Sequence, residues 1–168
     1  MDAKKKKAQD AASILNHLLG DLVGASRSYS IFEQLADRAN AKKIRLVMRR
    51  MFVSYIILTL AKISEFYDKY HDVIPEECRR PCKDLKTKIE KLGIRDFRNV
   101  FVGHIHDKSD RPISDDQIDD HYQKITNGDV IKFLEWINTP DTNTFSTTVV
   151  GIVESTRDKI LQQYGVSL

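Results

Sequence analysis

Two long stretches of apolar residues at helical spacing constrain the fold of this chain more than any other feature. The first runs from Ile14 to Leu35 and the second from Ile44 to Tyr70, with apolar side chains recurring three and four positions apart. We therefore expect one helix over residues 8–39 and a second after Asn40, packed as an antiparallel pair. The middle of the second stretch, Met51 to Ala61, is apolar on nearly every side, which predicts the most buried helix of a bundle.

Composition supports an all-α fold in a single domain, residues 1–168. The chain contains only seven glycines and four prolines, too few for a β-sandwich, and it is 41% hydrophobic and 30% charged. The longest apolar run has about eleven residues, whereas a membrane-spanning helix needs about 20. We therefore expect no association with a membrane.

Several shorter helices are expected after the long pair. The segment His71 to Pro81 is interpreted as a connection. Ser114 and Gln117 have the spacing of a capping box, which predicts the start of a helix. The expected helices cover 82–92, a motif-bearing segment that begins near Arg95, 114–127, 129–137 and 144–164, with a short strand over 147–150 as the alternative at the start of the last one.

Positive charge is concentrated towards the N-terminus. The net charge of the chain is +3, and residues 1–60 contain eleven lysines and arginines against five acidic residues. The run Lys4 to Lys7 can follow a phosphate backbone without reading its sequence. Because chain ends of this composition are often poorly ordered, we interpret residues 1–7 as a disordered basic arm.

The two cysteines, Cys78 and Cys82, predict neither a metal site nor a disulfide framework. A single C-x3-C pair lacks the second pair of ligands that a zinc site needs. Reduced thiols are typical of the cytoplasm, and the apolar residues after Lys7 are interrupted by His17 and Asp21, unlike those of a signal peptide. We therefore expect a cytoplasmic protein without a metal or another cofactor.

The segment Arg95 to Lys108 holds the residues best suited to chemistry. Arg98 carries a permanent positive charge on a planar fork that fits a phosphate, and His104 can transfer protons near neutral pH. This combination suits phosphodiester chemistry. On one straight helix Arg98 would point about 120° away from His104, so a catalytic site built from them predicts a second copy across a two-fold axis.

A structural interpretation of the same residues remains open. His104 lies near the helix face of Phe97 and could be a hydrogen-bonded, partly buried histidine. Arg98 could instead form an ion pair with an acid such as Asp96 or Glu90. The residues after His104 would then form a polar helix end.

The sequence Arg98-Asn99-Val100-Phe101-Val102-Gly103-His104 resembles the R-x(4–6)-H signature of the HEPN superfamily, which has a polar residue directly after the arginine. The expected helix order, two long helices, a shorter one and then the motif helix, is similar to that family too. His106 followed by Asp107 makes the motif most similar to the abortive-infection U-type branch.

This resemblance implies a metal-independent endoribonuclease of a toxin or phage-defence type, acting as a homodimer; an antitoxin is a further candidate partner that the sequence leaves open. His104 would be the general base for a ribose 2′-hydroxyl, and Arg98 would bind the scissile phosphate and stabilise its charge. Asn99 would position the phosphate or the imidazole, and the product would carry a 2′,3′-cyclic phosphate. Further contacts to RNA would come from Arg95, His106 and Lys108.

Two other functions fit the same residues. The first is a non-catalytic HEPN-like module that binds RNA, a nucleotide or a protein partner. The second is a purely structural helical adaptor. Charge does not separate the enzyme from the binding module, because both need contacts to phosphate, and only turnover distinguishes them.

Overall fold

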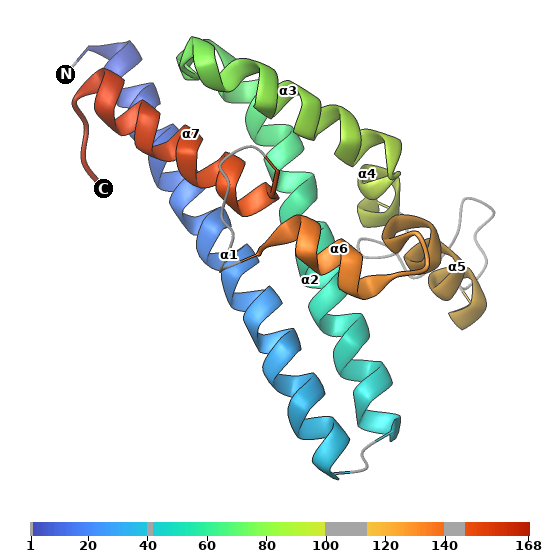
Figure 1. Cartoon of the computed structure of the whole chain (residues 1–168). Helices are drawn as coiled ribbons and strands as arrows, with labels where there is room; N and C mark the ends of the chain where they lie inside the picture. The colour runs from blue at the N-terminus through green and yellow to red at the C-terminus, as the bar shows by residue number, and fades with distance from the viewer. Residues whose placement is uncertain (1, 40–41, 100–113, 140–146) are drawn as a thin grey trace.

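The fold is an all-α bundle, as predicted. The computed structural model describes residues 2–39, 42–99, 114–139 and 147–168, and these residues form helices without a strand. α1 (Ala3–Ala39) and α2 (Lys42–Tyr70) form the expected long antiparallel pair (Figure 1). None of the described helices is long and apolar enough to cross a membrane.

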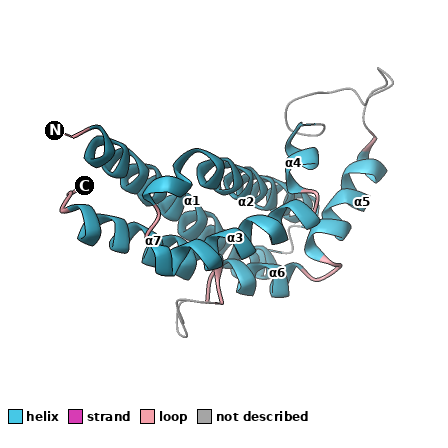
Figure 2. Cartoon of the chain, turned by 90° about the horizontal axis from the view of Figure 1, so that it is seen from above, coloured by secondary structure: helices cyan, strands magenta, loops and turns pink. Residues whose placement is uncertain are grey.

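The shorter helices gather around one half of the α1–α2 pair. α7 packs along α1, and α3 contacts both α2 and α7. Seen from above, α3, α6 and α7 lie on the same side of the pair, with α4 and α5 at one end (Figure 2). In chain order these elements are the 3-10 turn η1 (His71–Val73), α3 (Glu76–Lys91), α4 (Ile94–Phe97), α5 (Asp115–Thr126), α6 (Val130–Ile137) and α7 (Val149–Tyr164).

The core is formed by apolar side chains from the long pair and from the helices that cover it. Leu22 of α1, Leu60 of α2, Ile89 of α3 and Ile160 of α7 all have no solvent exposure. Burying a side chain of this size contributes about 1.5–3 kcal/mol. Packing between helices therefore holds the fold together.

The middle of α2 is less buried than the sequence predicts. Ile56, Ile57 and Leu60 are fully buried, but the side chains on the opposite side of the helix are not. Met51 is 59% exposed and Tyr55 is 44% exposed. An apolar helix is buried all round only if neighbours cover every side, and one side of α2 has no neighbour in the described chain.

The connection expected over His71 to Pro81 is wrong, because α3 begins at Glu76. Pro75 is the N-cap residue of α3, and Glu76 and Glu77 stand in its first turn, where negative charge favours a helix start. Proline inside a helix is unfavourable by about 3 kcal/mol, which is why the sequence pattern suggested a later start. Burial of Cys78 against the core favours the longer helix.

The disordered arm expected over residues 1–7 is also wrong from Ala3 onwards, because α1 includes Lys4 to Lys7. Lys7 Nζ lies 2.7 Å from Asp72 Oδ1 at the end of α2. Ala8 and Ala11 are fully buried. These contacts tie the first turns of α1 to the bundle.

The cap residues of α5 and α7 explain where these helices begin. Ser114 and Gln117 form the predicted capping box, with Gln117 N donating to Ser114 Oγ and Ser114 N donating to Gln117 Oε1. In α7, Gly151 N donates to Thr148 Oγ1 over 3.0 Å, so the helix starts at Val149. The strand alternative is wrong for Val149 and Val150, which are helical; residues 144–146 lie outside the described part.

We predict that Leu60→Ala destabilises the protein by about 2–5 kcal/mol, because it leaves a cavity at the centre of the α1–α2 contact. Chemical denaturation followed by circular dichroism measures this loss. Met51→Ala is the matched control on the same helix and should change the free energy of unfolding by less than about 1 kcal/mol in the monomer. Equal losses for the two variants would contradict this core.

Candidate functional site

α4 is a single helical turn that holds the predicted arginines against α2. Gly93 has a left-handed backbone, with φ of +69°, which ends α3 and lets α4 start at once. Ile94 and Phe97 are buried, and the Phe97 ring lies 5.2 Å from the Tyr122 ring of α5. Because Ile94 and Phe97 point into the core, the side chains that follow each of them point outwards.

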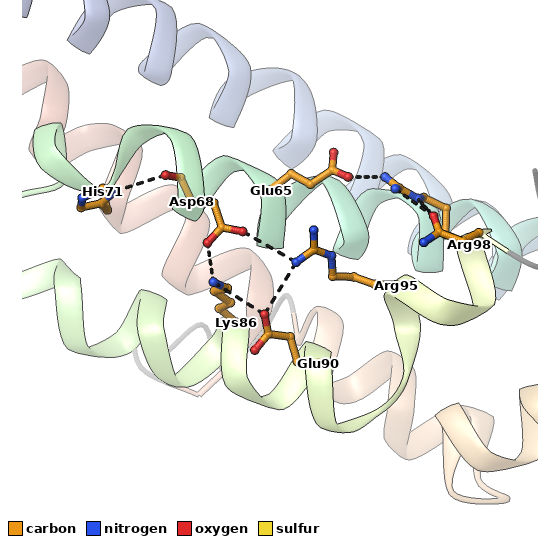
Figure 3. Close-up of polar contacts among 8 residues, drawn as sticks. Glu65, Asp68, His71, Lys86, Glu90, Arg95 and Arg98 are labelled. Carbon is orange, nitrogen blue, oxygen red and sulfur yellow. Dashed lines mark hydrogen bonds and ion pairs between the residues drawn. The ribbon is translucent and has the colours of Figure 1, made fainter.

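Arg98, directly after α4, is held by two partners. One of its terminal nitrogens, Nη1, pairs with the carboxylate of Glu65 on α2 (Figure 3). Its Nε and Nη2 donate to Asn99 Oδ1 over 3.1 and 3.0 Å. The Arg98 side chain keeps 31% of its surface exposed. The guanidinium is therefore fixed in orientation while one edge remains open to solvent.

Arg95 belongs to a second group of charges beside the first (Figure 3). Its Nη1 lies 3.7 Å from Asp68 Oδ2 on α2 and 3.8 Å from Glu90 Oε1 on α3. Lys86 bridges the same two carboxylates, and its hydrogen bond to Asp68 raises the pKa of the ammonium group. These side chains are 22–46% exposed, so each pair contributes at most about 1 kcal/mol.

The arrangement sets a limit on what this site can do. The three basic side chains Lys86, Arg95 and Arg98 are matched by three acidic ones, and a phosphate must compete with these acids for the arginines. Arg98 has five N–H groups, and three of them point to Glu65 and Asn99. No other described residue accepts a hydrogen bond from the two that remain, one on each terminal nitrogen, and these can bind an oxyanion.

The structure brings together part of the predicted site. Arg98 and Asn99 are in direct contact, and Arg95 stands one turn before Arg98 on the same side of α2. The ion pair that the structural interpretation gave Arg98 is confirmed, but its partner is Glu65 instead of Asp96 or Glu90, and Glu90 pairs with Arg95. The predicted residues outside the described part are His104, His106 and Lys108.

Three residues of this site were missed in the sequence, namely Lys86 on α3 and the two acids of α2. Glu65 and Asp68 lie three positions apart on α2, which places them on one helix face. That spacing is common on exposed helix surfaces, so it carried no signal by itself. Only the docking of α4 against α2 shows that both carboxylates receive arginines.

The two cysteines are free thiols on α3, of which Cys78 is buried and Cys82 is half-buried. Cys82 Sγ lies 3.2 Å from Thr156 Oγ1 of α7. Burial raises the pKa of Cys82 to about 11 and raises that of Cys78 as well. Among the described residues no three His, Cys, Asp or Glu side chains are grouped so as to hold a metal ion.

We predict that neither thiol reacts with iodoacetamide at pH 7.5 in the folded protein, because the reactive thiolate form is suppressed when the pKa is raised. Both should react in denaturant, and no zinc should co-purify. Mass spectrometry of the alkylated protein and elemental analysis measure the two outcomes. Fast labelling of the native protein, or stoichiometric zinc, would show that this end of α3 is open.

Comparison with known proteins identifies a fold but no family. No family model matches the chain, and no curated protein matches it. Among solved structures, the integron cassette protein Vpc_cass2 from the mobile metagenome of V. paracholerae is similar, with a TM-score of 0.81 and 25% sequence identity. The alignment covers 92% of this chain and 96% of that one. The bundle therefore exists as a fold of nearly this length in a protein carried by a mobile gene cassette.

Proposed function

We propose that this protein is a metal-independent endoribonuclease in which Arg98, Asn99 and His104 cut RNA. The proposal rests on the resemblance of the motif to the HEPN signature. The observation that carries it is the contact between Arg98 and Asn99. A polar residue directly after the arginine fixes the guanidinium, as a site that must present N–H groups to one phosphate requires.

The cleavage follows from the chemistry of these side chains. His104 takes the proton from a ribose 2′-hydroxyl. The 2′-oxygen then forms a bond to phosphorus, the bond from phosphorus to the 5′-oxygen breaks, and the 5′-oxygen leaves as a hydroxyl after it takes a proton from water. The two remaining N–H groups of Arg98 stabilise the charge that develops on the phosphate. One product carries a 2′,3′-cyclic phosphate and the other a 5′-hydroxyl.

Glu65 is proposed as a positioning residue for this reaction. Its carboxylate holds Nη1 of Arg98, and the guanidinium therefore keeps its direction before RNA arrives. Arg95 is paired with two carboxylates, so it offers a weaker contact to RNA than Arg98 does. We further propose that the active protein is a cytoplasmic homodimer, as the resemblance implies, and that an antitoxin controls it.

The charge balance of the site favours a second candidate function. Three carboxylates stand beside the three basic side chains, and an excess of positive charge is what strong phosphate binding requires. A non-catalytic HEPN-like module that binds RNA or a nucleotide needs the same excess, so the balance favours the form of that module that binds a protein partner. The same charges would then serve mainly to dock α4 onto α2.

We predict that His104→Ala lowers RNA cleavage at least ~100-fold without changing the fold, because it removes the general base. Arg98→Ala should lower both cleavage and RNA affinity, because it removes a phosphate contact and the stabilisation of charge. Cleavage of a labelled RNA pool, with RNA affinity and circular dichroism for each variant, measures these effects. Cleavage by the unmodified protein should persist in EDTA.

Matched controls are available on exposed surfaces away from the motif. His17→Ala on α1 and Arg80→Ala on α3 remove the same residue types, and the Arg80 side chain is 93% exposed. Both variants should cleave as the unmodified protein does. RNA binding without any cleavage would contradict the ribonuclease proposal and support the non-catalytic binding module. Unfolding of the His104→Ala variant would support the interpretation of His104 as a partly buried, structural histidine.

A further inference from the structure

One face of the α1–α2 pair carries large apolar side chains that are exposed to solvent. They occupy the half of the pair nearest the connection between α1 and α2, which extends beyond α6 and α7 (Figure 1). Elsewhere in the described chain, only two large apolar side chains are as exposed. The side chains of this outer face are Ile31 (58% exposed) and Leu35 (55%) of α1, and Ile44 (60%), Val47 (58%), Met51 (59%) and Tyr55 (44%) of α2.

Helical spacing and one hydrogen bond place Leu35 and the α2 side chains on the same side, and Ile31, one turn before Leu35, lies at the edge of this face, where it also lines a pocket with Ile131 of α6. On α2 they recur at intervals of three and four residues, which forms one continuous stripe. Tyr55 donates its hydroxyl proton to Asp21 Oδ1 on α1 over 2.8 Å. Leu35 follows Asp21 by two intervals of seven residues and so lies on the same side of α1. The core side chains of α2, such as Ile56, point to the other side.

The same sides of α1 and α2 are polar in the half of the pair that lies away from the connection between them. Seven-residue steps from Ile31 lead back to Gly24 and His17 on α1, and steps from Tyr55 lead on to Lys62 and Lys69 on α2. A solvent-facing stripe of a soluble helix is normally polar in this way. The change to apolar residues occurs only on the outer face, and exposed apolar patches of this kind mark contact surfaces.

We propose that the outer face packs against the same face of a second copy of this chain. With about 200 Å² for a fully exposed large side chain, the six residues present on the order of 700 Å² per chain. Two copies would bury about 1,400 Å², and stable interfaces bury about 1,200–2,000 Å². The stripe positions carry no charge, and Arg45 and Arg49 beside them are paired with Glu33 of α1, so among the described residues a two-fold axis places no unpaired charge at the centre of the contact.

The assembly is a four-helix layer formed by two α1–α2 pairs. It covers the side of α2 that carries Met51 and Tyr55, which the isolated chain leaves exposed. The proposed interface does not depend on nuclease activity, because it is formed by apolar packing alone. The cleavage proposed above does require a dimer, so loss of the dimer would remove that mechanism, whereas loss of cleavage would leave the dimer intact.

We predict that multi-angle light scattering at about 50 µM gives twice the 19.4 kDa chain mass. Met51→Lys should convert the protein to a monomer with unchanged helix content, because a two-fold axis places two lysines in one apolar contact. Val47→Lys tests a second position of the same stripe. Leu168→Lys is the matched control, since Leu168 is 62% exposed and follows Ser167, whose carbonyl accepts a hydrogen bond from Gln9 at the other end of α1. That variant should remain dimeric.

Two results would overturn this interface. One is an unmodified protein that stays monomeric at this concentration, including one that binds lipid vesicles or another protein through the outer face. The other is a dimer that persists in both Met51→Lys and Val47→Lys. Circular dichroism of each variant separates loss of the dimer from loss of the fold.

Discussion

The packing of α2 against its neighbours is the interaction on which the rest of the structure depends. Its inner side buries Ile56, Ile57 and Leu60 against α1 and the covering helices. Its C-terminal half carries Glu65 and Asp68, which receive the arginines of the α4 segment. Ion pairs at this exposure contribute little to stability, so burial of apolar side chains places the arginines, and the charges then fix their direction.

The sequence predicts the parts of this fold that depend on repeated patterns. Apolar spacing predicts the long helix pair, and the Ser114–Gln117 capping box predicts where α5 begins. Prediction from the sequence fails where tertiary contacts outweigh a local signal. Pro81 suggested a late start for α3, but the buried Cys78 draws five further residues and Pro81 itself into that helix. The run Lys4 to Lys7 suggested a disordered arm, but burial of Ala8 and Ala11 against the bundle holds the first turns of α1 in place.

The candidate site could be predicted only in part, for a related reason. Arg98 and Asn99 are neighbours in sequence, so a motif can reveal their contact. Glu65 is more than thirty positions away, and no local pattern links it to Arg98. The exposed side of α2 escaped prediction as well, because composition alone does not tell which sides of an apolar helix have neighbours. A second copy supplies the missing neighbour in the assembly proposed here.

The chemistry of the RNA ends tests the central claim most directly. An RNA oligonucleotide that the protein cuts at one position would be compared with the same oligonucleotide carrying a single 2′-deoxy sugar on the 5′ side of that bond. Because the 2′-hydroxyl is the nucleophile, the account predicts a 2′,3′-cyclic phosphate from the first substrate and no cut at that bond in the second. Cleavage of the deoxy substrate, or a product with a 3′-hydroxyl and a 5′-phosphate, would contradict it.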